Sequence, residues 1–137
     1  MANEAVITDL LGNNGDVIEM SCATGTDIPK GTVLKMTDPR TVIAASGDGD
    51  IVAGIAATDY DGATGRGTIG VVTNCIAKFT VAAGTTTTLG STVRHSGTAN
   101  KIKVITTLDH ETGKSLGKAL EDGAAGETVL VRVHTLA

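Results

Sequence analysis

The stretch TVLVRVH, residues 128–134, carries the clearest secondary-structure signal in the chain. Val129, Val131 and Val133 occupy alternate positions, and Arg132 lies between two of them. Because successive side chains of a β-strand point to opposite faces, this alternation predicts a strand with an apolar inner face and a polar outer face. How often the same pattern recurs elsewhere in the chain decides the fold class.

The two-residue period does recur, and turn residues separate the runs. Glycine, asparagine and aspartate dominate these separators, as expected for tight turns between short strands. The turn Asn13-Asn14-Gly15-Asp16 contains Asn-Gly, which predicts a hairpin between the two runs that flank it. Besides 128–134, the predicted strand runs are Val6–Leu11, Val17–Cys22, Thr32–Met36, Ile51–Thr58, Thr68–Thr73, Cys75–Val81 and Ile102–Thr106.

Helical periodicity is nearly absent from the chain. At most one short helical turn fits, near Leu116–Glu121. Many short strands with regular turns predict an all-β fold, a small barrel or sandwich. Two segments also resemble each other, because Gly54–Asp59 and Gly117–Asp122 are each followed by a glycine turn and a second strand run. Two copies are too few for a solenoid, so we expect two similar hairpins in one domain.

Composition and charge exclude several classes of protein. The 137 residues are 41% hydrophobic with a net charge of −4, which favours a folded domain over a disordered chain. The eleven basic residues are scattered and aromatic residues are scarce, so we expect neither a nucleic-acid partner nor a membrane partner. No signal peptide or apolar run of about 18 residues occurs, so we expect synthesis in a cytoplasm.

Cys22 and Cys75 are the two cysteines of the chain, and each lies in an apolar strand-like run. Two buried thiols that behave as small hydrophobic side chains are the favoured interpretation. A disulfide between them remains open at this point, although two cysteines do not make the framework of a secreted protein.

A search for reactive groups returns only incomplete motifs. Gly113-Lys114-Ser115-Leu116-Gly117 fits Gly-x-Ser-x-Gly, but the strained strand-to-helix turn that this motif needs is not predicted here. Asp59-Tyr60-Asp61-Gly62 lacks the further ligands of a calcium loop. His95, His110 and His134 are far apart, show no metal-ligand spacing and are expected to be exposed. We therefore expect no catalytic residue, no metal, no cofactor and no enzymatic activity.

The N-terminal segment differs from the rest of the chain. We assign residues 1–16 to an N-terminal arm that includes the first hairpin strand, and residues 17–137 to a single β domain. Ala5-Val6-Ile7 is an apolar stretch near a chain end, and such a stretch can add as a strand to the sheet of a neighbour. An edge strand in its own domain, or a frayed terminus, is the alternative.

The order of several motifs resembles that of the capsid decoration, or cement, proteins of tailed viruses. The similar motifs begin with Ile28–Leu34, continue through Gly54-Ile55-Ala56, Thr68–Val72, Cys75–Val81 and Leu89–Val93, and end with Gly117–Val133. Each motif is generic, and their order carries the resemblance. It implies a β-tulip-like domain, commonly a homotrimer, that binds the major capsid protein on the outer surface of the virion.

The resemblance also implies a role for the arm. In this family the arm often becomes ordered on the shell, so the expected capsid or neighbour contacts are Ala2, Asn3, Glu4, Ala5, Val6 and Ile7. Another virion component, such as a tail, fibre or head-completion protein, is the first alternative. A small-ligand-binding barrel is a weaker alternative, because the face of Val129, Val131 and Val133 suits a packed interior. An enzyme would be revealed by loss of hydrolysis in Ser115→Ala.

Overall fold

The computed structural model describes residues 3–22, 25–48, 50–63, 67–104 and 114–134, and it confirms the all-β prediction. Eleven strands lie within these ranges, which contain no helix. The strands are β1 (Val6–Leu10), β2 (Ile18–Ser21), β3 (Val33–Asp38), β4 (Thr41–Ala44), β5 (Val52–Ala56), β6 (Thr68–Val72), β7 (Asn74–Val81), β8 (Thr92–His95), β9 (Lys101–Val104), β10 (Gly117–Ala119) and β11 (Thr128–His134).

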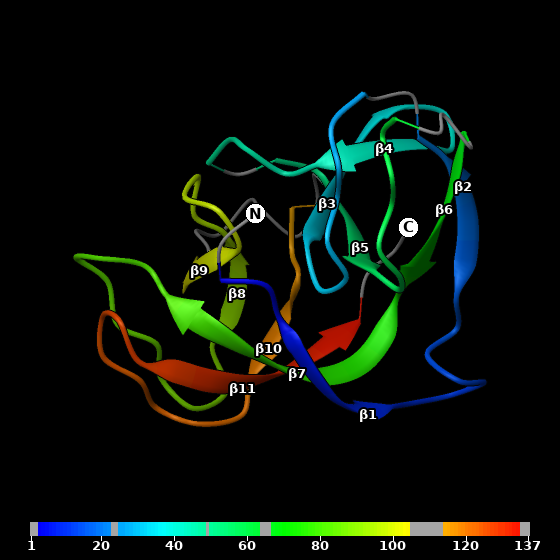
Figure 1. Cartoon of the computed structure of the whole chain (residues 1–137). Coiled ribbons are helices and arrows are strands. Elements are labelled where there is room, and N and C mark those ends of the chain that lie inside the picture. The colour runs from blue at the N-terminus through cyan, green and yellow to red at the C-terminus, as the bar shows by residue number, and fades with distance from the viewer. Residues whose placement is uncertain (1–2, 23–24, 49, 64–66, 105–113, 135–137) are drawn as a thin grey trace.

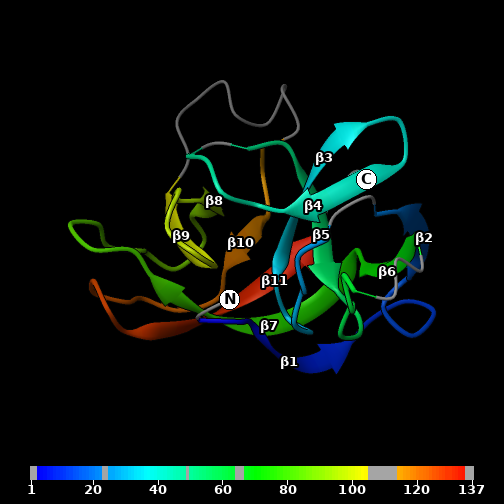
Figure 2. The ribbon, with the colours of Figure 1, turned by 45° about the horizontal axis from the view of Figure 1, so that its top comes forward.

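The strands form two small barrels that lie side by side (Figure 1). The first is closed in the order β2-β4-β3-β5-β6. The second contains β7, β11, β10, β8 and β9, and the pairing of β7 with β9 closes it. The remaining strand, β1, pairs antiparallel with β7 on the outside of the second barrel. Figure 2 shows the same two groups of strands from a second direction.

The two barrels have the same topology, so the fold is an internal duplication. In the first, β2 pairs antiparallel with β6 and parallel with β4. In the second, β7 pairs antiparallel with β11 and parallel with β9. The middle strands correspond as well, because β3 pairs with β4 and β5 as β8 pairs with β9 and β10. The strand β1 has no counterpart among the described strands.

Individual residues repeat along with the strands. Arg40 and Asn100 stand just before β4 and β9, and both have the positive φ that a tight turn requires. Gly54 and Gly117 both lie beside the backbone of the next strand, where a Cβ atom would collide with the carbonyl oxygens of Val72 and Arg132. The predicted similarity between 54–59 and 117–122 is therefore one part of a repeat that spans five strands.

Each barrel has its own apolar interior. In the first, the buried cluster includes Met20, Leu34, Val42, Ile69 and Val71. In the second, the inward faces of β7 and β11 have the predicted alternation, and every one of those residues is at most 1% exposed. They are Cys75, Ala77, Phe79, Val81, Val129, Val131 and Val133. Filled interiors of this kind favour a packed structural domain over a ligand-binding barrel.

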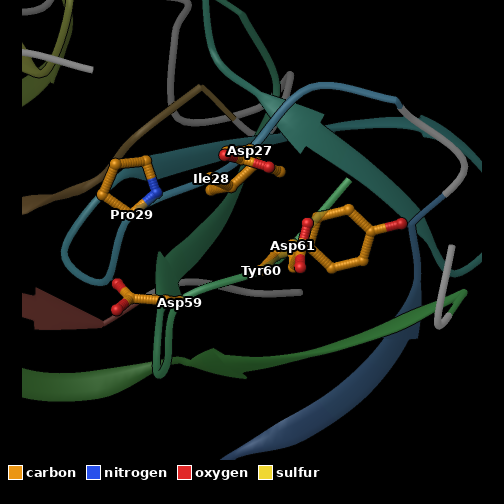
Figure 3. A pocket seen from close by; sticks show the side chains of 6 residues that line it. All are labelled: Asp27, Ile28, Pro29, Asp59, Tyr60 and Asp61. Atoms are coloured by element: carbon orange, nitrogen blue, oxygen red, sulfur yellow. The ribbon is translucent and has the colours of Figure 1, made fainter. Parts of the chain in front are cut away.

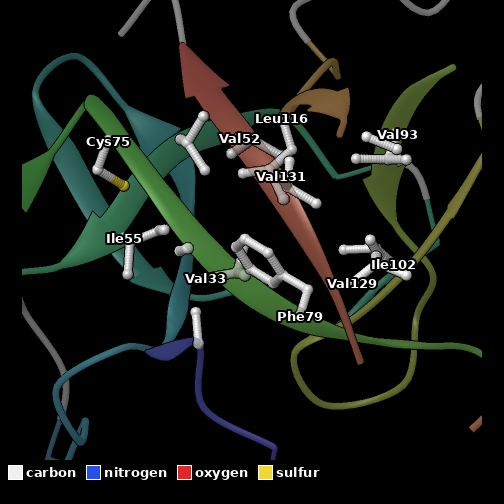
Figure 4. Packing of buried hydrophobic residues seen from close by; sticks show 14 of the residues in the cluster. Val33, Val52, Ile55, Cys75, Phe79, Val93, Ile102, Leu116, Val129 and Val131 are labelled. Carbon is white, nitrogen blue, oxygen red and sulfur yellow. The ribbon is translucent and has the colours of Figure 1, made fainter. Parts of the chain in front are cut away.

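The first barrel also packs its outer wall against the second, and Figure 4 shows this contact beside Phe79. Val33, Ile55 and Val72 belong to the first barrel, yet they lie in the same buried cluster as the interior of the second. The corresponding positions of the second barrel are Thr92, Lys118 and Arg132, none of which is buried. The sequences of the two repeats differ here because one outer wall is buried and the other faces solvent.

A polar contact supplements this apolar one. Asn100 is fully buried, and its side-chain oxygen accepts a hydrogen bond from the Val33 amide at 2.9 Å. Asp48 bonds to Arg94 at 3.0 Å and to Lys103 at 2.6 Å, which links the loop after β4 to the second barrel. A buried polar side chain that bonds across an interface helps to hold its two sides in one arrangement.

Two sequence-based expectations were wrong. The hairpin between the runs flanking Asn13–Asp16 does not form, since β1 pairs with β7 and β2 pairs with β6. His95 is fully buried, with its Nδ1 atom 3.1 Å from the Gly47 carbonyl oxygen.

Candidate interaction surface

The arm that was predicted to contact a neighbour lies against the protein itself. Ala5 is 7% exposed, and its amide donates to the Gly31 carbonyl at 2.8 Å. Asn3 is exposed, Glu4 is partly buried, and Ile7 packs partly against the core. Ala2 lies outside the described residues. The segment is thus an edge strand of its own domain, which was the alternative interpretation of this sequence.

The arm nevertheless presents apolar side chains to solvent. Val6 is 61% exposed and Leu10 is 51% exposed, both on β1. Val17, just before β2, is 47% exposed. Val6 pairs with Lys78 and Leu10 with Cys75, so Val6 and Leu10 lie on opposite faces of β1, whereas Leu10 and Val17 border the same hollow. Single exposed apolar side chains are ordinary, but two beside one hollow offer area that an interaction would bury favourably. Val6 was predicted from the sequence as a contact residue, whereas Leu10 and Val17 were assigned to paired strands of a hairpin.

A hollow of about 430 Å³ lies between β1 and the outer wall of the first barrel. Its arm side is formed by four consecutive residues, 7–10, and its other side is largely apolar. The residues that line it are Ile7, Thr8, Asp9, Leu10, Asn14, Val17, Lys30, Ala57 and Val72. We define this hollow, with Val6, as the arm surface.

A second hollow of about 460 Å³ continues along the arm. It is lined by Glu4, Ala5, Val6, Ile7 and Lys30, and therefore shares Ile7 and Lys30 with the first. The predicted contact residues from Glu4 to Ile7 thus all border an open depression. Opposite charges, on Glu4 and Asp9 on one side and Lys30 on the other, provide polar contacts along it.

A third hollow is acidic and is explained by turns. It lies at the Asp59–Asp61 turn, and Figure 3 shows that the carboxylates of Asp27, Asp59 and Asp61 stand apart. Each accepts a backbone hydrogen bond, from Gly62, Lys30 and Ala63 respectively. Within the described ranges, no group of three His, Cys, Asp or Glu side chains could hold a metal ion. These carboxylates cap turns, as the Asp-Gly sequence predicts.

The remaining sequence motifs are not brought together into one site. Ser115 lies just before β10, which pairs antiparallel with β8 and β11, so it does not occupy a strand-to-helix turn. His134 is exposed at the end of β11, and His110 lies outside the described residues. The part of the chain that the structure describes contains no helix long and apolar enough to cross a membrane.

Both cysteines are free and buried, in agreement with the favoured interpretation. Cys22 belongs to the interior of the first barrel and Cys75 to the cluster of the second. Burial raises the pKa of the Cys75 thiol to about 11, although the positive charge of Arg132 partly opposes this shift. Because the thiolate is the reactive form, Cys75 is a packing residue rather than a nucleophile.

Comparison with known proteins relates the chain to one class of fold. No protein-family model matches it, and no curated protein matches it by sequence. Among solved structures, it is similar to the head fiber gp8.5 N base in bacteriophage phi29, with a TM-score of 0.51 and 12% sequence identity. The match covers 88% of this chain and 97% of that chain. At this level of identity the similarity shows a shared fold.

Proposed function

We propose that this chain is a structural protein of a tailed-virus virion that binds the outer surface of the major capsid shell as a decoration protein. The observation that carries the proposal is the fold shared with a phage head fiber base over most of both chains. Motif order in the sequence supports it independently. The arm surface supplies the exposed apolar area that attachment to a shell requires.

A decoration protein stabilises a shell by bridging its subunits. Contacts on two or more subunits must be lost before those subunits separate, so each bound copy raises the cost of shell opening. A stable specific contact buries about 1,600 Å² in total, and the symmetry of the shell multiplies this contact over many sites. The rigid packing of the two barrels suits this role, because a flexible bridge would stretch without transmitting force.

A homotrimer is part of the proposal, since a ring of three copies matches the threefold-related positions of a shell. Light scattering on the purified protein tests this part, and it should give three times the chain mass of 13.8 kDa. A monomer at the same concentration would exclude the trimer in solution. The chain is proposed to act without catalysis, and without nucleic-acid or membrane partners.

The base of a head fibre is the second candidate, because the structural similarity is to a protein of that description. Both candidates attach to the outside of a head, and they differ in what the bound protein supports. Imaging undecorated shells after mixing with the purified protein distinguishes them. A decoration protein gives low density at every equivalent shell position, whereas density confined to a few projecting sites would favour the fibre base. Shells that show no added density after mixing would contradict both candidates.

A further inference from the structure

We propose that the groove beside β1 receives an extended segment of the partner, which adds to the second barrel's sheet as a further strand. The groove is the 430 Å³ hollow between β1 and the first barrel. That the segment comes from the major shell protein rests on the proposed function. That the groove binds an extended peptide is argued from the geometry of β1 alone.

The first step is that the groove borders the backbone edge of β1. This hollow is lined by the consecutive residues Ile7, Thr8, Asp9 and Leu10. The register of β1 shifts between Ile7 and Asp9, so Ile7 and Leu10 lie on one face of the strand and Asp9 lies on the other. A hollow that residues of both faces line lies at the edge between those faces. Figure 1 shows β1 at the margin of the molecule, beside β7.

The second step is that this edge is unpaired. The amide of Leu11 donates to the Asn74 carbonyl at 3.1 Å, toward β7. Because backbone groups alternate in direction along a strand, the amide and carbonyl of Leu10 point away from β7. The Ala5 amide also points away, since it donates to Gly31 of the first barrel. No other described strand pairs with β1, so its outward groups face the groove.

The third step concerns the opposite wall, which fixes the chemistry of the occupant. Val17, Ala57 and Val72 give this wall an apolar surface. A strand hydrogen-bonded to β1 would turn its far edge to this wall and continue the two faces of β1. The segment should therefore place small apolar residues on the face of Ile7 and Leu10 and alternate them with polar ones. Strand spacing of about 4.8 Å, a rise of about 3.3 Å per residue and a layer depth of about 10 Å give the groove room for about three residues.

The internal duplication shows what keeps the groove open. Ala57 corresponds to Leu120 of the second barrel, and Gly70, next to Val17 and Ala57, corresponds to Leu130. The first barrel thus has the smaller residue at both positions of the wall that faces β1. Substituting Ala57→Leu installs the side chain of the other repeat and should fill the groove without disturbing the barrel.

The test distinguishes the contribution of the Leu10 backbone amide to peptide binding from that of the Leu10 side chain. Leu10→Pro removes an amide that points into the groove, and proline is tolerated where a strand's N–H faces outward. Leu10→Ala removes the same side chain but keeps the amide, so it is the matched control. The probe is the peptide acetyl-Thr-Val-Thr-Val-Thr-amide, added up to millimolar concentration and followed through the backbone amide signals of the protein. A Thr-Pro-Thr-Pro-Thr peptide is the control ligand.

The expected result is a set of shifts at Ile7, Thr8, Leu10 and Ala57 that Leu10→Ala retains and Leu10→Pro loses. Ala57→Leu should weaken binding at least about tenfold, and it remains informative if the proline variant fails to fold. Absence of shifts in the folded wild type, or equal shifts in both Leu10 variants, would contradict the pairing of an extended peptide with β1 in the groove.

Shell binding by the same variants separates this inference from the proposed function. If the wild type binds shells and Leu10→Pro binds them equally well, strand addition in the groove is contradicted and the decoration function is retained. If the protein binds the peptide but does not bind shells, the decoration function is contradicted and strand addition in the groove is retained.

Discussion

Asp59 and Asp122 make the same hydrogen bond in the two halves of the molecule. The Oδ1 atom of Asp59 accepts from the Lys30 amide at 2.7 Å, and that of Asp122 accepts from the Leu89 amide at 2.7 Å. Asp59 lies between the paired strands β5 and β6, and Asp122 lies between the paired strands β10 and β11. Each carboxylate ties its connection to the turn that precedes β3 or β8. The duplication therefore extends from the strand order to the individual contacts that close each barrel.

This equivalence predicts equal effects of two substitutions. Asp59→Ala and Asp122→Ala should each lower the free energy of unfolding by about 1 to 2 kcal/mol, because a hydrogen bond to a charged group is lost at an exposed turn. Urea unfolding measures the change. Asp38→Ala, an exposed aspartate on β3, is the control and should change stability by less than about 0.5 kcal/mol. A large loss of stability in only one of the two variants would contradict the equivalence of the Asp59 and Asp122 hydrogen bonds.

The buried bond between the barrels predicts a larger effect. Asn100→Gly keeps the positive φ but removes the oxygen that accepts the Val33 amide, so it should destabilise the protein by about 2 to 3 kcal/mol. Asn100→Ala should cost more, since alanine is also strained at positive φ. If both variants unfold at the wild-type urea concentration, Asn100 does not join the barrels.

Asp50 predicts the acid dependence of stability. Burial alone would raise its pKa, but hydrogen bonds from the Gly47 and Ser46 amides and the charge of Lys35 lower it below the usual 3.8. Because the folded pKa is depressed, the carboxylate stabilises the fold above pH 3.8 and loses this effect as the pH falls through the folded value.

Asp50→Asn should consequently flatten the stability profile between about pH 5 and about pH 2. The measurement is the urea midpoint of both proteins across this range. Wild type and variant should converge as the pH falls. Two parallel profiles, separated by a constant difference, would show that the ionised form of Asp50 is not what stabilises the loop.

The burial of both cysteines predicts the outcome of a thiol-reactivity assay. Native protein at neutral pH should react slowly with a thiol reagent, because both sulfur atoms are buried and the pKa of Cys75 is raised to about 11. Unfolding in urea should release two reactive thiols per chain. Fast reaction of one thiol in the native protein would mean that one of the barrels opens readily.

Strand positions were predictable from the sequence where one face is buried. The alternation along 75–81 and 128–134 identified β7, β11 and their inward faces, because burial of one face imposes a period of two. The strands β4 and β8, each four residues long, were missed because runs of that length carry few alternations to distinguish a strand from a turn. The strand β10 lies in the segment 117–122 that was assigned to the second of two similar hairpins.

Strand partners were less predictable, because pairing depends on contacts between distant residues. Asn14 and Gly15 do have the positive φ that their sequence predicts, yet β1 pairs with the outside of the second barrel and β2 belongs to the first barrel. The duplication was visible only at 54–59 and 117–122. Elsewhere the repeats diverged with their surroundings, as where buried Val72 corresponds to partly exposed Arg132.

The candidate site was predictable only in part. The apolar stretch Ala5-Val6-Ile7 indicated an arm with a role at a surface. The groove beside it combines residues 7–10 with Val17, Ala57 and Val72, which come together only once the first barrel packs against the second. No sequence pattern links these positions, since they lie on separate elements.

The central claim is attachment to a shell through the arm surface, and cosedimentation of the purified protein with undecorated shells tests it most directly. The wild type should sediment with the shells to saturation, and the double variant Val6→Asp with Leu10→Asp should bind at least about tenfold more weakly while remaining as stable as the wild type. Leu89→Asp, at the 66% exposed Leu89 of the second barrel, should bind like the wild type. Wild-type protein that stays in the supernatant, or an arm variant that binds fully, would contradict the claim.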